Sequence, residues 1–183
     1  MLGSCGTQEH MMPKPSKFYQ RLVFLTLYPA CLPVDKALVR LTGYSLVNRI
    51  YAKAGGMRER PCLLMTTLHW KTGAPKTVVL PYHPFDHRYV VQGSLAGRPQ
   101  DPVWATNVRA YPFTWLKVDG AWKFCRAQIA QGEERERIWK EITSDGAYVG
   151  YAKKAYPRIL PLVVHTPVDP NTVTKPDIDR AQD

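Results

Sequence analysis

A short bend between two apolar segments carries the residue types that bind anions. Residues 66–76 read TTLHWKTGAPK, where Lys71 supplies a cation, Thr72 a hydroxyl and Gly73 a point of close backbone approach. A bend with unpaired amides beside a cation and a hydroxyl can bind phosphate or carboxylate. An ordinary hairpin with a solvent-exposed lysine has the same composition, so the bend alone leaves both interpretations open.

Two further segments place aromatic and amide side chains among glycines. The first, 93–112, reads GSLAGRPQDPVWATNVRAYP and contains Trp104 and Asn107, and the second, 145–157, contains Tyr148 and Tyr151 three residues apart. Trp104 fits a ligand-binding wall and a hydrophobic core equally well. The two tyrosines share one helix face, where they could contact a ligand or cover a sheet.

The histidines do not indicate a metal site. His83 and His87 flank a turn in the stretch HPFDHR, and no third ligand is evident near them. His165 is expected at the end of the last strand. We therefore predict no metal.

Hydrophobic periodicity and turn residues predict the elements that position these side chains. An N-terminal arm should contain one helix at 16–28 and a second from Pro33 to about Lys53, with Gly43 as a break. Asp101 is the expected N-cap of a helix at 102–110. Strands are expected at 62–68, 76–83, 88–94, 113–118, 121–130 and 159–166, and further helices at 132–142 and 147–156. This order predicts an α+β fold whose six antiparallel strands close into a small barrel.

Length and composition indicate one folded unit with polar ends. The chain has 183 residues, 45% of them hydrophobic and 22% charged, which excludes wholesale disorder and a polytopic membrane protein. We predict a flexible tail and helical arm over 1–57, a barrel domain over 58–167 and a disordered tail over 168–183. The four cysteines form no C-x-x-C pair, which favours reduced thiols and a cytoplasmic location. The formal charge of +10 favours anionic partners.

Together the three segments resemble the deazaflavin-dependent nitroreductase family, over roughly residues 60–167. The family has a Thr-Thr strand end followed by a bend of the type G-R-K-[ST]-G-x-P-R, which Thr66 to Lys76 matches. The pattern P-x-W-x-x-N-[LV]-x-A-x-P is matched at 102–112. A Y-x-x-Y pair after an EER…W helix is matched by Tyr148 and Tyr151.

The resemblance implies a split β-barrel of the FMN-binding type and transfer of a hydride from reduced coenzyme F-420 to a quinone, nitro compound or activated alkene. It implies that Lys71 and Thr72 hold the coenzyme's phosphate or oligoglutamate tail. Tyr148 and Tyr151 would be the catalytic pair on the substrate side, where a phenol orients or protonates the reduced product. The coenzyme-binding residues that it implies are Trp70, Lys71, Thr72, Gly73, Lys76, Ser94, Leu95, Ala96, Gly97, Arg98, Val103, Trp104 and Asn107.

The sequence departs from the family pattern at three points. The family's Gly-Arg before the lysine is His69-Trp70 here, and Lys76 replaces an arginine. A segment that is usually rich in lysine or glycine carries Leu95 and Arg98 instead, and Arg98 is a candidate replacement for the lost charge. These departures keep three alternatives open: FMN or heme as cofactor, an FMN-dependent reductase, or a non-catalytic protein that binds flavin, heme or fatty acid.

The expected partner is a small-molecule electron acceptor. Nucleic acid is not expected, because no RNA- or DNA-binding motif occurs. The arm sequence KFYQRLVFLTLYPACL mixes basic, aromatic and aliphatic residues, which fits peripheral contact with an anionic membrane as well as packing on the barrel or on a second protomer. A homodimer therefore stays open.

Overall fold

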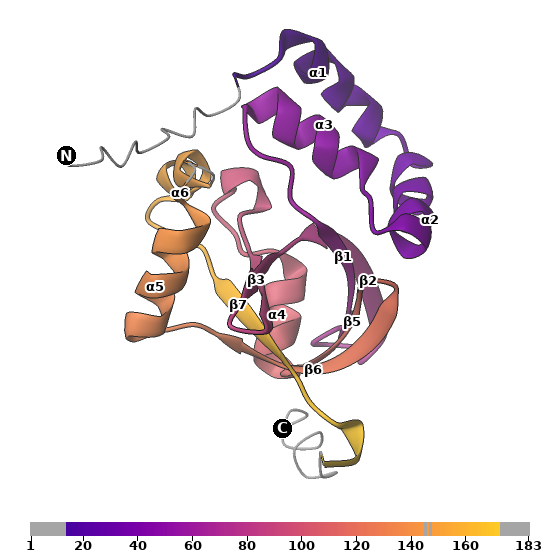
Figure 1. Ribbon diagram of the computed structural model, residues 1–183, viewed down its shortest axis with the longest axis vertical. Coiled ribbons are helices and arrows are strands. Elements are labelled where there is room, and N and C mark those ends of the chain that lie inside the picture. The colour runs from indigo at the N-terminus through magenta and orange to yellow at the C-terminus, as the bar shows by residue number, and fades with distance from the viewer. Residues whose placement is uncertain (1–13, 145, 147, 173–183) are drawn as a thin grey trace, which may run out of the picture.

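The computed structural model describes residues 14–144, 146 and 148–172. Its strands form one antiparallel sheet in the order β2-β1-β5-β6-β7-β4-β3, which curls into a half-barrel (Figure 1). The strands are β1 Cys62–Leu68, β2 Pro75–Pro81, β3 His83–Phe85, β4 Arg88–Gln92, β5 Phe113–Val118, β6 Ala121–Ile129 and β7 Leu162–Pro167. The fold class is α+β, as predicted.

Helices lie on both sides of this sheet. The arm helices gather on one side and α5 and α6 on the other (Figure 1). The arm consists of α1 Lys17–Leu22, the 3-10 helix η1 Val23–Leu27, α2 Cys31–Thr42 and α3 Leu46–Gly55. The remaining helices are η2 Leu95–Gly97, α4 Val103–Ala110, α5 Gly132–Ile142, α6 Val149–Ala155 and η3 Pro170–Thr172.

A buried carboxylate joins the arm helices. Asp35 of α2 accepts hydrogen bonds from the Ser45 hydroxyl at 2.8 Å and from the Val47 amide at 3.1 Å. Ser45 in turn caps α3 by accepting from the Asn48 amide at 2.9 Å. These bonds satisfy amides that a helix start leaves unpaired, so α2 and α3 hold a fixed angle.

No single helix in the described part of the chain is long and apolar enough to cross a membrane. The segments Lys17–Thr26 and Cys31–Thr42, bent by 104° relative to each other, meet the length and composition criteria only as a pair.

Alternation along the strands creates two apolar faces. On β1, Leu63 and Met65 face the barrel interior, where Leu116 also lies, while Leu64 faces outward against Val39 of α2. α4 contributes three buried residues to the interior, namely Trp104, Ala105 and Val108. On the opposite outer face α5 packs its buried isoleucines on β4 and β7. The barrel is therefore a filled core, and α4 is fixed at its mouth.

The sheet has seven strands where six were predicted. The predicted strand 76–83 divides at Tyr82, which turns into the core while its amide donates to the Pro61 carbonyl at 3.0 Å. Residues 83–85 then form a separate strand paired with β4.

Several helix boundaries also differ from the prediction. The helix expected at 16–28 changes to a 3-10 helix at Val23, and the helix expected after Pro33 begins at Cys31. The predicted break at Gly43 is confirmed: its φ of 72° ends α2 in the left-handed region. Val168 donates to the Phe124 carbonyl, and η3 follows, so 168–172 are ordered despite the predicted tail. The remaining tail residues, 1–13 and 173–183, lie outside the described residues.

His165 makes the folded state sensitive to acid. Its ring is fully buried in β7, beside the Thr114 hydroxyl at 3.0 Å from Nδ1. Burial lowers the pKa of His165 from 6.5 to about 3. Below pH 6.5 the unfolded chain therefore binds a proton that the folded chain does not bind until about pH 3. The free energy of unfolding must then fall as pH falls through this range.

We expect the variant His165→Gln to lose less stability on acidification than the parent protein. The parent should lose up to about 1.4 kcal/mol per pH unit from this one group. Urea unfolding at neutral and mildly acidic pH gives the change in unfolding free energy with pH for each protein. Comparing these two changes cancels any cost of the substitution that does not depend on pH. Parallel pH profiles for the two proteins would contradict this account.

Candidate functional site

A cavity of ≈ 820 Å³ opens between the arm, β2, the segment 94–104 and α6. Its arm side combines apolar and polar residues. The apolar ones are Leu32, Val47, Tyr51, Ala52 and Met57, and the polar or charged ones are Asp35, Lys36, Ser45, Asn48, Arg58 and Arg60. Strand β2 contributes a second apolar wall from Val78 to Pro81. The size and apolar lining suit a small organic ligand.

The segment 94–98, here called the cradle loop, has an unusual backbone. Leu95 and Ala96 have φ values of 44° and 53°, in the left-handed region that costs a non-glycine residue on the order of 1–2 kcal/mol. Gly97 follows with φ 77° and is buried under Lys154 of α6. None of the hydrogen bonds within the described residues uses the amides of Ser94, Leu95 or Ala96. These amides are donors for a ligand that carries carbonyl or anionic oxygens.

α4 supplies the wall beside the cradle loop. Trp104 is only 7% exposed, so the core interpretation is confirmed, and because it also lines the cavity the ligand-wall interpretation stays a prediction. Val103 is exposed at the helix start and lines the cavity as well. The N-cap of α4 is Pro102, not Asp101, because the Asp101 carboxylate instead binds the guanidinium groups of Arg109 and Arg158.

Tyr148 and Tyr151 lie side by side on the same cavity. Their ring centroids are 6.4 Å apart, and the Tyr148 ring also contacts that of His83 at 5.6 Å. Burial, and to a lesser extent Tyr51, raises the pKa of Tyr151. Its phenol therefore stays protonated at neutral pH and can donate a hydrogen bond or a proton. The helix expected from 147 begins at Val149, with Tyr148 as its N-cap at φ 64°.

The lysine bend is anchored next to α4. The buried Asn107 accepts from the Trp70 amide at 3.1 Å and donates to the Thr67 hydroxyl at 2.9 Å. This link places the bend about one helical turn along α4 from Val103. At its tip Lys71 lies over the Trp70 ring, 4.6 Å from the centroid. The lysine is exposed and within reach of solvent anions.

The predicted site residues thus fall into two groups. Those that line the cavity are Ser94, Leu95, Ala96, Arg98, Val103, Trp104, Tyr148 and Tyr151. Those on or beside the bend, outside the cavity lining, are Trp70, Lys71, Thr72, Gly73 and Lys76. Gly97 and Asn107 are buried supports, one beneath the cradle loop and one between the bend and α4.

Sequence patterns missed two contributors to the cavity. The arm forms a complete wall, although its apolar periodicity indicates only that one face is buried. Arg158, which binds the backbone of the cradle loop, has no sequence signal because its partners are 57 to 65 residues away.

The comparisons with known proteins agree with this arrangement. Residues 42–167 match the family model described as F420H(2)-dependent quinone reductase. The chain belongs to this family. A quinone reductase of that description from Mycobacterium tuberculosis is 29% identical over 110 residues, which cover 58% of this chain and 73% of the relative. The family match begins within α2, so most of that helix lies outside it.

Two solved structures share the fold. An F420-H2 dependent reductase has a TM-score of 0.52 and 30% identity, and covers 58% of this chain and 94% of its own. A protein described as a domain-swapped dimer has a TM-score of 0.53 and 27% identity, and covers 73% and 98%. The split-barrel architecture predicted from the sequence is therefore confirmed.

Proposed function

We propose that this protein transfers a hydride from reduced coenzyme F-420 to a quinone or to another electron-poor acceptor, such as a nitro compound or an activated alkene. The observation that carries the proposal is the cavity, which combines an indole wall, two tyrosines and backbone amides that have no partner among the described residues. The family match supports the choice of cofactor.

The donor set fits a planar, anionic coenzyme. Trp104 and Val103 offer an apolar surface for a ring system, and the amides of the cradle loop can donate to ring oxygens. Arg98 borders the cavity with an exposed guanidinium, while Lys71 and Thr72 stand on the bend beyond α4. We assign the ring to the cavity, where the amides of the cradle loop can donate to it. The expectation of unpaired amides in the bend was wrong, because those of Lys71, Thr72 and Gly73 all donate to His69. We assign the phosphate or oligoglutamate tail to the bend because Lys71 supplies an exposed cation there.

The bound coenzyme supplies the hydride, and the protein positions and protects the reactants. Val103 and Trp104 hold one face of the ligand, and the arm wall around Tyr51 excludes water from the other part of the cavity. Tyr151, kept protonated by burial, donates a hydrogen bond or proton to the acceptor oxygen as charge develops there. Neither a protein nucleophile nor a metal is needed for this reaction.

An absorbance assay tests the reaction directly. Reduced coenzyme F-420 is mixed with the protein, and its oxidation is followed after addition of a simple naphthoquinone. We expect catalytic oxidation that depends on both protein and quinone. Equal rates with and without protein, across quinones, nitroaromatics and activated enones, would overturn the proposed activity and favour a binding protein of the same fold.

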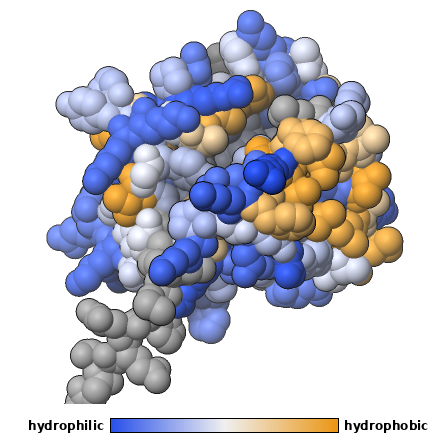
Figure 2. Space-filling view, turned by 90° about the horizontal axis from the view of Figure 1, so that it is seen from above, coloured by the Kyte–Doolittle hydropathy of each residue, from blue (hydrophilic) through white to orange (hydrophobic). Residues whose placement is uncertain are grey.

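We also propose that the arm contacts an anionic membrane surface. Large apolar side chains are exposed along it, including Phe18 at 65%, Val34 at 65% and Leu41 at 84%. Figure 2 shows hydrophobic residues gathered on the α2 side of the molecule. Residues 17–55 contain six lysines and arginines but a single carboxylate, the buried Asp35. Apolar contact combined with positive charge is typical of proteins that bind anionic lipid.

Vesicle binding should therefore depend on the arm. We expect the protein to sediment with vesicles containing phosphatidylglycerol and not with pure phosphatidylcholine. The double variant Phe18→Ser/Val34→Ser should bind roughly tenfold more weakly, since each side chain loses apolar transfer energy. Ile159→Ser is the control, because Ile159 is 73% exposed but lies outside the arm. If Ile159→Ser weakened vesicle binding as much as the double variant does, the arm would not be the membrane contact.

We also propose that the protein forms a homodimer. It is supported by the relative described as a domain-swapped dimer. Light scattering on the purified protein decides between one chain and two per particle.

A further inference from the structure

We infer that Arg158 is a positioning residue for coenzyme binding: it turns the backbone amides of the cradle loop toward the cavity. The inference rests on the proposed function, because it assumes that a ligand with oxygen acceptors fills the cavity. Arg158 is not among the residues that line the cavity, so its effect must pass through the loop.

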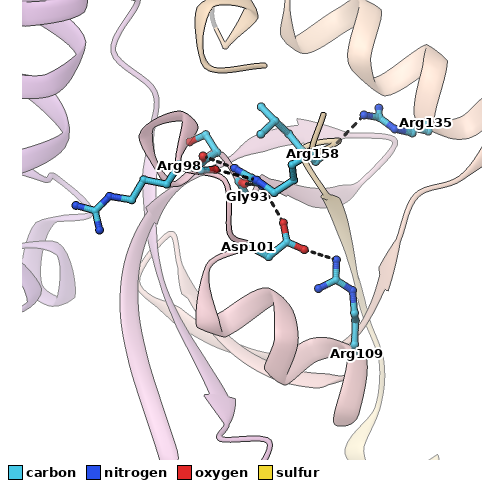
Figure 3. A network of polar contacts seen from close by, with 8 residues as sticks. Gly93, Arg98, Asp101, Arg109, Arg135 and Arg158 are labelled. Carbon is cyan, nitrogen blue, oxygen red and sulfur yellow. Dashed lines mark hydrogen bonds and ion pairs between the residues drawn. The ribbon is translucent and has the colours of Figure 1, made fainter. Parts of the chain in front are cut away.

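The guanidinium of Arg158 makes four hydrogen bonds to one short segment, residues 93–101. Its Nε donates to the Arg98 carbonyl at 3.0 Å, and its Nη2 donates to the Ser94 carbonyl at 2.8 Å. Nη1 donates both to the Gly93 carbonyl at 3.0 Å and to Asp101 at 2.8 Å. The side chain is only 11% exposed. Figure 3 shows these bonds converging on Arg158, while the Arg98 side chain points away from them.

The geometry of the peptide bond determines the direction in which the cradle-loop amides point. In a trans peptide the carbonyl and the following N–H point in opposite directions. Capture of the Gly93 and Ser94 carbonyls by Arg158 therefore directs the Ser94 and Leu95 amides away from it. Ser94 and Leu95 line the cavity, and neither amide has a hydrogen-bond partner within the described residues. We therefore assign these two amides as donors to a ligand in the cavity.

The same bonds hold the strained backbone in place. Leu95 and Ala96 stay in the left-handed region only while their surroundings fix them. Asp101 extends the clamp, because one oxygen binds Arg158 and the other binds Arg109 of α4 at 2.5 Å. The arrangement ties the cradle loop to the helix that carries Trp104. Arg158 thus sets the position of the donors relative to the indole wall.

Lysine cannot replace this arginine. Three carbonyls and a carboxylate require donors spread over a planar fork, whereas the three donors of an ammonium all lie on one nitrogen and cannot span these acceptors. We expect Arg158→Lys and Arg158→Gln both to raise the dissociation constant for coenzyme F-420 at least tenfold. The KM for the quinone should stay unchanged, because the acceptor side of the cavity is not touched.

Arg135 provides a matched control. It also donates from a guanidinium to a backbone carbonyl in the neighbouring segment, that of Leu160 at 3.3 Å, but makes no bond to the cradle loop (Figure 3). Arg135→Gln should lose a similar hydrogen bond and keep parental coenzyme affinity. Asp101→Asn is isosteric and leaves the three carbonyl bonds of Arg158 in place. It should therefore weaken coenzyme binding less than the Arg158 variants.

Fluorescence titration with oxidised coenzyme F-420 measures affinity without turnover. Hydrogen exchange of the peptide spanning 92–98 adds a second readout: the bound coenzyme should protect these amides in the parent and not in Arg158→Gln. If the parent binds the coenzyme and both Arg158 variants show the same affinity and the same protection, the role of Arg158 is overturned. The proposed function would still stand. A parent protein that binds no coenzyme would instead overturn the proposed function, and this role with it.

Discussion

Gly97→Ala should separate the two walls of the cavity and abolish tight coenzyme binding. A Cβ at this position would lie 2.9 Å from Cβ, 3.1 Å from Cγ and 3.0 Å from Cδ of Lys154. Since the Lys154 Cβ is fixed to the backbone of α6, the clash is relieved only if the helix moves away from the cradle loop. The φ of 77° adds strain that glycine does not have.

The expected cost combines overpacking with left-handed strain. Together these amount to about 2–4 kcal/mol of unfolding free energy. Coenzyme affinity should fall at least tenfold, because α6 carries Tyr151 and the loop carries the amide donors. Urea unfolding and fluorescence titration measure the two effects separately.

Gly120→Ala is the matched control for this prediction. Gly120 has nearly the same φ, 76°, yet nothing lies within 4 Å of an added Cβ. It should cost only about 1 kcal/mol and leave coenzyme binding unchanged. If the two alanine variants bind the coenzyme equally well, the packing of α6 on the cradle loop does not shape the site.

Tyr151→Phe should lower kcat for quinone reduction about 100-fold while coenzyme affinity stays at the parental value. A positioned acid typically contributes 10²–10⁴ in rate, and phenylalanine preserves the ring without the proton. Because burial raises the pKa of Tyr151 above its ordinary 10.0, the phenol remains protonated through neutral and mildly alkaline pH. The parental rate should therefore be flat over this range and fall only above it.

An exposed tyrosine on the same segment serves as the comparison. Tyr156 is 83% exposed, so Tyr156→Phe should have parental kcat. The same assay on Tyr148→Phe tests the other tyrosine of the pair. A Tyr151→Phe protein with full kcat and an unaltered pH profile would remove Tyr151 from the catalytic step.

The sheet was largely predictable because alternation encodes it locally. Leu63 and Met65 on one face and Leu64 on the other already define β1, and the Asp119-Gly120 pair, with φ values of 51° and 76°, forms the expected hairpin turn. The additional strand at 83–85 was not predictable, since it depends on Tyr82 leaving the sheet for the core.

The sequence predicted eight of the residues that line the cavity, but it did not predict how the candidate residues are grouped in space. Motif order brought together the cradle loop, Trp104 and the tyrosines, yet it did not reveal that Lys71 lies outside the cavity lining. Asp101 looked like an N-cap because its position before a helix is typical of one. Arg109 and Arg158 take its carboxylate instead, and such long-range competition has no local pattern.

The most direct test of the central claim is a fluorescence titration of the purified protein with coenzyme F-420 and, in parallel, with FMN. We predict saturable binding of the deazaflavin that is tighter than that of FMN and that Lys71→Ala weakens, because the bend then loses its cation for the anionic tail. Binding of FMN alone, or of neither compound, would contradict the assignment of this cavity to coenzyme F-420.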